Sequence, residues 1–79
     1  MLINTGAQVH HECEVGEFSE VGHGALLLGA SKIGDRCRIG AGAVILPGIV
    51  LGDEVIVGAG AVVTKDFPSK GILKGVPAR

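Results

Sequence analysis

The side chains able to take part in proton transfer, metal binding or nucleophilic attack gather toward the N-terminal end of this chain. His11, Glu12 and Cys13 are consecutive, His10 precedes them, and His23 is the remaining histidine. An imidazole beside a carboxylate can act as a general base near neutral pH. The first question is therefore which elements of the fold position these residues.

Composition indicates one small folded domain. The chain has 79 residues, of which 47% are hydrophobic and 14 are Gly, and its net charge is −1. Disorder is disfavoured because apolar residues are abundant and charges are few. The scattered charges provide no basic patch for nucleic acid or anionic lipid.

The sequence also predicts a location. The apolar stretch Ala43–Gly52 contains Pro47 and is shorter than the roughly 20 residues that a membrane-spanning helix needs. The N-terminus lacks the basic and apolar regions of a secretory signal. Two Cys do not form a disulfide scaffold, so we expect a cytoplasmic protein with reduced thiols and no membrane partner.

A six-residue repeat is the strongest signal in the sequence. When the chain is divided into hexads from Ile3, eleven hexads run without interruption to Pro68, and every first position is aliphatic. Most fifth positions are small, and the second position is Gly in six hexads, where we expect Gly to supply the backbone conformations of tight corners. Neither a helical period of 3.6 nor a strand period of 2 explains this repeat.

The repeat predicts a solenoid of short strands with three hexads per coil. This pattern resembles the hexapeptide-repeat, left-handed parallel β-helix, an all-β fold whose left hand is implied by the resemblance. Eleven hexads give about 3.7 coils over residues 1–68, and Gly71, Gly75 and Pro77 favour an irregular tail over residues 69–79. So short a solenoid lacks burial at its ends, so we expect it to form oligomers, and the resemblance implies a homotrimer.

Three hexads per coil place residues 18 apart in vertical columns. His11, Gly29, Pro47 and Lys65 share one column, whereas His23 shares another with Thr5, Ala41 and Ala59. Cys13 and Cys37 fall in inward-facing fifth positions. They are 24 residues apart and thus on different walls, which disfavours a disulfide and predicts two buried small side chains.

The segment from Asn4 to Ser19 carries a more specific resemblance. An Asn-Thr pair is followed by His11-Glu12-Cys13 and then by Gly16-Glu17-Phe18. With the later Gly-Ala-Gly-Ala stretches and the terminal Gly-Val-Pro-Ala-Arg, this resembles the acetyl-coenzyme A-dependent sugar acetyltransferases of the sialic-acid O-acetyltransferase type, whose bacillosamine branch acetylates a nucleotide-linked amino sugar. The resemblance covers essentially the whole chain.

The resemblance implies direct transfer of an acetyl group to an amine or hydroxyl of a sugar or nucleotide-sugar, with acetyl-coenzyme A as co-substrate and no metal. His11 would be the general base and Glu12 would tune or orient it. The Gly29 N–H would face the thioester carbonyl, where negative charge develops. The pantetheine arm would run between subunits past the backbone of Ala41 and Ala59, and Lys65 would meet the coenzyme phosphates.

Two departures from this family keep an alternative open. Many relatives carry a second His directly after the Phe-Ser pair, where this chain has Glu20. Full-length relatives also have an N-terminal α/β domain that grips the nucleotide, and this sequence does not contain it. The alternative is a non-catalytic trimeric β-helix module, either a fragment or a degenerate paralogue.

Three other kinds of site fit the spacing less well. γ-Class carbonic anhydrases share this fold and bind zinc through three His, two of them five residues apart, whereas no two His here have that spacing. His10-x-Glu12 resembles the first half of a zinc-deaminase motif, but no Pro-Cys-x-x-Cys follows. The stretches Gly40–Gly42 and Gly58–Gly60 lack the third Gly of a dinucleotide fingerprint.

Overall fold

The structure is a computed structural model that describes residues 2–68 and 70–78. Met1, Ser69 and Arg79 lie outside the described residues. Arg79 is the last residue of the Gly-Val-Pro-Ala-Arg segment, so that segment is described only as far as Ala78. The described residues form twelve short strands. These are β1 (Leu2–Ile3), β2 (Gln8–Val9), β3 (Glu14–Val15), β4 (Glu20–Val21), β5 (Leu26–Leu27), β6 (Lys32–Ile33), β7 (Arg38–Ile39), β8 (Val44–Ile45), β9 (Val50–Leu51), β10 (Val55–Val57), β11 (Val62–Val63) and β12 (Gly71–Leu73).

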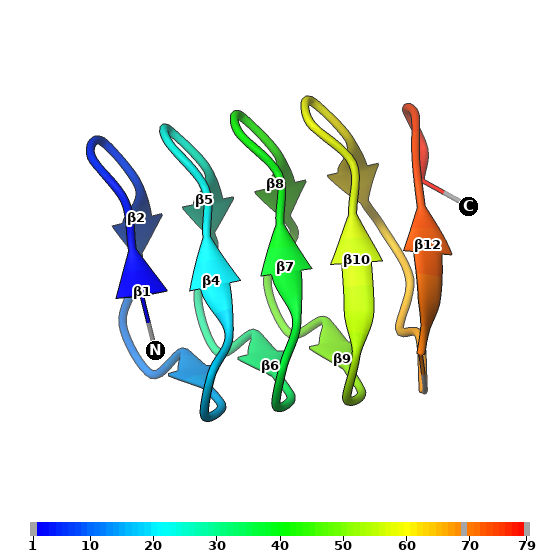
Figure 1. The fold of residues 1–79 in the computed structure, drawn as a ribbon, viewed down its shortest axis with the longest axis horizontal. Helices are drawn as coiled ribbons and strands as arrows, with labels where there is room; N and C mark the ends of the chain where they lie inside the picture. Colours follow the sequence, from blue (N-terminus) through cyan, green and yellow to red (C-terminus); the bar gives the residue numbers. More distant parts are fainter. Residues whose placement is uncertain (1, 69, 79) are drawn as a thin grey trace.

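The strands build three parallel sheets around one axis. Sheet 1 has the order β1-β4-β7-β10-β12, sheet 2 the order β2-β5-β8-β11, and sheet 3 the order β3-β6-β9. Each of the first three coils therefore contributes one strand to each wall of a triangular prism, and the fourth contributes β10 and β11. The chain winds with a left-handed sense as it advances from the N-terminus (Figure 1). The predicted left-handed parallel β-helix is confirmed.

The predicted stacking of residues 18 apart is confirmed over most of the chain. Gln8 lies beside Leu26, Leu26 beside Val44, and Val44 beside Val62, and the other two sheets keep the same spacing. Backbone amides connect the coils in the same register, as in the 2.8 Å bond from the Gln8 N–H to the Ala25 carbonyl. Every coil thus positions its turns directly above those of the coil before it.

The register changes after Val63, in the last hexad. Phe67 lies beside Leu51, and Gly71 beside Val55, so the spacing between neighbouring strands falls from 18 residues to 16. The Asp66 carboxylate contributes to this, because its Oδ1 accepts the Val50 N–H at 2.8 Å. Beyond it, the segment expected to be an irregular tail contains β12, which extends sheet 1.

The aliphatic residue that opens each hexad points into the prism. From the fourth hexad onward these side chains are at most 4% exposed: Val21, Leu27, Ile33, Ile39, Ile45, Leu51, Val57 and Val63. In the first coil, Ile3 is 41% exposed, and Val9 and Val15 are half-buried. The apolar interior is thus open at its N-terminal end.

The expected reason for Gly at the second position of the hexad is wrong. None of these Gly residues has a positive φ, and a Cβ on Gly40, for example, would lie 2.5 Å from the Ala59 nitrogen and 2.7 Å from the Gly58 carbonyl carbon. At Gly16, Gly22, Gly34 and Gly40 a Cβ would come within 3.0 Å of the next coil, which explains the Gly there, whereas at Gly58 the nearest atom would be 3.5 Å away, an ordinary contact. The left-handed conformation occurs instead at the fourth position of the hexad, where non-Gly residues such as Glu12 (φ 63°) and Phe18 (φ 58°) also adopt it.

Candidate functional site

The three edges of the prism hold the turns and with them most of the candidate residues. The His11 corner, between sheets 2 and 3, comprises residues 11–12, 29–30, 47–48 and 65. The His23 corner, between sheets 1 and 2, comprises residues 5–6, 23–24, 41–42 and 59–60. The Asp35 corner, between sheets 3 and 1, comprises residues 17–18, 35–36 and 53–54.

His11 and Glu12 form the tip of the first turn of the His11 corner. The Cys13 N–H donates to the His10 carbonyl at 3.2 Å and closes this turn. The His11 Nε2 lies 3.4 Å from the Glu12 Oε1, and the two side chains are 92% and 71% exposed. The predicted contact between imidazole and carboxylate is therefore present, on a surface open to an incoming molecule.

Gly29 lies one coil above His11, as its sequence spacing predicts. The Ala30 N–H donates to the His11 carbonyl at 3.1 Å, and the Gly48 N–H to the Gly29 carbonyl at 2.9 Å. A Cβ on Gly29 would meet only the His11 carbonyl oxygen, at 4.0 Å, so the chain itself leaves this position open. Pro47 continues the column in the next coil, and Lys65 follows β11, the last strand in the 18-residue register, where the register begins to change.

Several backbone amides along the corners have no hydrogen-bond acceptor in the described part of the chain. They include the N–H groups of Gly29, Ala41 and Ala59, each at the third position of its hexad. At the Asp35 corner, by contrast, the Glu17 N–H donates to Asp35 Oδ1 and the Asp35 N–H to Asp53 Oδ1, both at 2.8 Å. The Glu17 and Asp35 amides of the third corner thus donate to aspartate side chains, whereas the corresponding amides of the other two corners have no such acceptor among the described residues.

Ala41 and Ala59 lie on the His23 corner and not beside His11. The Gly42 N–H donates to the His23 carbonyl and the Gly60 N–H to the Ala41 carbonyl, each at 2.9 Å, which stacks the three turns. One face of the prism, sheet 2, separates this corner from His11 and Gly29. A single chain therefore does not bring the six predicted site residues together.

The outer face of sheet 2 is apolar. Outward-facing residues of β5, β8 and β11 are aliphatic, and the residues that follow β5 and β8 are Leu; all are half-buried in the single chain: Leu26, Leu28, Val44, Leu46 and Val62. Sheet 3, in contrast, carries an exposed Lys32–Glu14 ion pair at 3.6 Å. The apolar face thus lies between the two corners that hold the predicted site residues.

The remaining His and Cys residues have local partners. The exposed His10 Nε2 lies 3.2 Å from the Gln8 Oε1. Cys37 is fully buried, and its Sγ donates to the Gly52 carbonyl at 3.0 Å. Burial raises the pKa of the Cys37 thiol above its ordinary value. Cys13 is half-buried at the open end, and both thiols are free, as expected.

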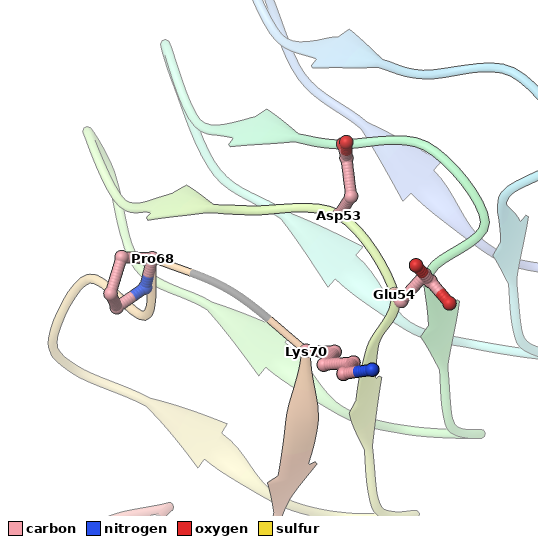
Figure 2. Close-up of a pocket in the computed structure, with 4 residues that line it drawn as sticks. All are labelled: Asp53, Glu54, Pro68 and Lys70. Atoms are coloured by element: carbon pink, nitrogen blue, oxygen red, sulfur yellow. The ribbon is translucent and has the colours of Figure 1, made fainter.

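A cavity that the sequence did not predict lies beside the Asp35 corner. It has a volume of about 320 Å³ and is lined by Asp53, Glu54, Pro68 and Lys70. Figure 2 shows Asp53 and Glu54 on one turn, and Pro68 and Lys70 on the chain that crosses beside it toward β12. The hexad pattern does not reveal this cavity because it depends on the register change after Val63.

The described ranges 2–68 and 70–78 contain neither a metal-binding cluster nor a membrane-spanning helix. Within these ranges no three His, Cys, Asp or Glu side chains gather closely enough to hold a metal ion. The same residues contain no helix long and apolar enough to cross a membrane.

Comparison with known proteins identifies the repeat. Residues 32–65 match the sequence family described as the hexapeptide repeat of succinyl-transferase. No curated protein matches the chain.

Solved structures match far more of the chain. PerB from Caulobacter crescentus, solved with CoA and GDP-perosamine, is 41% identical with a TM-score of 0.95, over 99% of this chain and 39% of that one. The acetyltransferase domain of PglB from Neisseria gonorrhoeae, solved with acetyl coenzyme A, is 39% identical with a TM-score of 0.94, over 96% and 37%. A maltose O-acetyltransferase from Clostridium difficile is 27% identical with a TM-score of 0.64, over 98% and 64%. The chain spans less than two-fifths of the first two structures.

Proposed function

We propose that this chain transfers an acetyl group from acetyl-coenzyme A to a sugar. The proposal starts from its hexapeptide-repeat β-helix, which is similar to the acetyltransferase structures that it matches. The observation that carries the proposal is the stacking of the His11–Glu12 turn beneath Gly29, in a fold shared with structures that hold CoA or acetyl coenzyme A. This stacking supports a site in which His11 and the Gly29 N–H act on one substrate from the same edge of the prism.

His11 is the general base of the proposed reaction. The acceptor nitrogen or oxygen attacks the acetyl carbonyl carbon, and a ring nitrogen of His11 takes the proton that the acceptor loses. Glu12, 3.4 Å from the imidazole, stabilises the protonated ring. When the carbon–sulfur bond breaks, His11 returns this proton to the leaving thiolate, so that the imidazole ends each cycle neutral.

Gly29 is the proposed donor to the carbonyl oxygen. Its N–H has no acceptor in the described part of the chain, and a Cβ at this position would meet only the His11 carbonyl oxygen, at 4.0 Å. Negative charge develops on the carbonyl oxygen as the acceptor attacks, and a fixed N–H donor stabilises it in the transition state more than in the ground state.

The proposed working unit is a homotrimer that buries the outer face of sheet 2. If three copies turn this apolar face toward a common axis, the His11 corner of each copy adjoins the His23 corner of the next. Ala41 and Ala59 of one copy then border the groove that contains His11 and Gly29 of its neighbour. Lys65, at the far end of the His11 column, would meet the coenzyme phosphates. A cytoplasmic location fits a protein that consumes acetyl-coenzyme A.

The proposed acceptor is the amino group of a nucleotide-linked sugar. Support comes from PerB, which was solved with GDP-perosamine and is 41% identical over nearly all of this chain. The similarity to a maltose O-acetyltransferase keeps a sugar hydroxyl as the other acceptor to be tested.

A specific observation favours a second candidate function, a trimeric module without catalysis. The His11 side chain is 92% exposed and its ring lies 3.4 Å from the exposed Glu12 carboxylate, and Glu20 adds a negative charge on β4, next to the His23 corner. An acid bordering the groove would disfavour the developing oxyanion.

Calorimetric titration with acetyl-coenzyme A separates these candidates, with the oligomeric mass measured in the same buffer. Saturable binding of one coenzyme per chain in a trimer, followed by transfer to a nucleotide-linked amino sugar, supports the enzyme. A folded trimer that binds no coenzyme at millimolar concentration, corresponding to a binding free energy weaker than about −4 kcal/mol, contradicts it.

A further inference from the structure

His23 is the one ionisable side chain on the His23 corner. The corner otherwise consists of Thr5, Gly and Ala, with Gly6, Gly24, Gly42 and Gly60 at its four left-handed positions. A Cβ on Gly24 or Gly42 would meet nothing within 4 Å. The His23 imidazole is therefore exposed, and the other residues of its corner have small side chains or none.

The His23 ring, unlike the other two imidazoles, lacks a partner among the described residues. The Nε2 of His10 lies 3.2 Å from Gln8 Oε1, and that of His11 lies 3.4 Å from Glu12 Oε1. No hydrogen bond or ion pair involves the His23 side chain within residues 2–68 and 70–78. Its ring nitrogens are thus available to a group outside the chain.

The height of His23 along the prism axis agrees with the height of the proposed acyl site. Each coil of 18 residues rises by about 4.8 Å, the spacing between neighbouring strands. By that measure residue 23 lies about 3 Å above residue 11 and about 2 Å below residue 29. Ala41 and Ala59, on the same corner, are roughly one and two coils higher.

We propose that His23 of one copy completes the acyl site of the adjacent copy, as a catalytic residue that donates a ring N–H to the thioester carbonyl oxygen. This inference rests on the proposed function and on the trimer that buries sheet 2. In that arrangement the His23 corner of one copy borders the His11 corner of the next, and His23 lies level with the space between His11 and Gly29. The His23 imidazole donates this hydrogen bond without transferring its proton and shares the developing negative charge with the Gly29 N–H.

The first test follows the three imidazoles by NMR during titration of the intact protein with acetyl-coenzyme A. Three single substitutions, His10→Asn, His11→Asn and His23→Asn, assign the ring C–H resonances. We expect the His11 and His23 resonances to move along the same binding curve while that of His10 stays in place. If acetyl-coenzyme A binds and moves the His11 resonance alone, the inference about His23 is wrong and the proposed function stands. If acetyl-coenzyme A does not bind, both are wrong.

The second test asks whether His11 and His23 act from different copies. We expect His11→Ala trimers to lose about 10²–10⁴-fold in transfer rate, as on removal of a general base, and His23→Gln trimers about 10²–10³-fold, by analogy with removal of one oxyanion donor. Co-refolded mixtures then restore activity, because adjacent copies of different type rebuild one intact site. Random assembly of equal amounts into cyclic trimers recovers about a quarter of the wild-type sites. A fully active His23→Gln trimer, or a mixture that stays as inactive as its components, overturns the proposal.

Discussion

The His11 carbonyl oxygen accepts a hydrogen bond from the Ala30 N–H at 3.1 Å, which holds the His11–Glu12 turn directly beneath the Gly29–Ala30 turn. This bond fixes the backbone of both turns. Among the described residues, neither the His11 imidazole of the lower turn nor the Gly29 N–H of the upper turn makes a hydrogen bond to the backbone. The coil that carries the proposed base therefore also holds the turn that carries the proposed oxyanion donor.

His11→Ala should lower the acetyl-transfer rate by about 10²–10⁴-fold, the usual contribution of a positioned general base. The affinity for acetyl-coenzyme A should change little, because the imidazole acts on the acceptor proton. Steady-state kinetics with calorimetry check both quantities. His10→Ala, which changes an exposed neighbour 3.2 Å from Gln8 Oε1, is the matched control and should retain its rate. Equal losses in the two variants would argue against a special role for His11.

Gly29→Ala should fold normally and bind acetyl-coenzyme A about tenfold more weakly, or about 1.4 kcal/mol. The position has no positive φ, and its nearest atom to a new Cβ is 4.0 Å away, so the chain accommodates the methyl group. A ligand that approaches the Gly29 backbone does not. Calorimetry measures the affinity and thermal unfolding measures the fold. Unchanged affinity would remove Gly29 from the site.

Gly40→Ala should destabilise the fold by about 1–3 kcal/mol or more, in the range of overpacking substitutions. The new Cβ would lie 2.5 Å from the Ala59 nitrogen, so two coils must separate for it to fit. Denaturant unfolding compares this variant with Gly29→Ala, which makes the same chemical change where space exists. Similar stabilities would show that the coils are not as closely spaced as the structure indicates.

Val44→Glu should dissociate the proposed trimer to chains of 8.0 kDa while leaving each chain folded. Val44 lies in the centre of the apolar face of sheet 2, and burying a carboxylate there without a partner is costly. Val50→Glu is the matched control because Val50 faces outward from sheet 3 and is 43% exposed. Analytical ultracentrifugation measures the mass. A trimer that tolerates Val44→Glu but not Val50→Glu would move the interface to sheet 3.

Stability should fall as the pH rises above about 9, and Cys37 should contribute to the slope. Burial raises the pKa of this thiol in the folded state, so the unfolded chain loses the proton first. Over that interval one such group can contribute up to about 1.4 kcal/mol per pH unit. Cys37→Ala should make the free energy of unfolding depend less steeply on pH, as measured by denaturant unfolding between pH 8 and the pKa of the thiol in the folded state. An unaltered slope would show that other groups cause it.

The hexad pattern predicts the fold almost completely, because each residue type has one steric task at its position. Aliphatic first positions from Val21 to Val63 are buried as expected. Two features depend on contacts between coils that the pattern does not encode. One is the reason for Gly at the second position, which is the close approach of the next coil. The other is the register change after Val63, where the Asp66 side chain bonds to the Val50 backbone.

The candidate site is predictable only in part. The 18-residue spacing correctly stacks Gly29 above His11 and separates both from His23. The same arithmetic assigns Ala41 and Ala59 to another corner, but spacing alone does not reveal that an apolar sheet lies between the two corners. Nor does the sequence reveal which backbone amides remain free, since that depends on the bonds each coil makes with the next.

From β1 to β11 the 18-residue register also lets the distance between two residues of one column take only discrete values. His11 and Pro47 are two coils apart, a separation of about 10 Å at the spacing of parallel strands. Inserting or deleting one residue would move every later side chain out of its column, whereas adding or removing a whole coil preserves every column. The span between the two ends of the groove can therefore change only in steps of about 4.8 Å. A homologue adapted to a longer or shorter acyl carrier would therefore have to gain or lose whole coils.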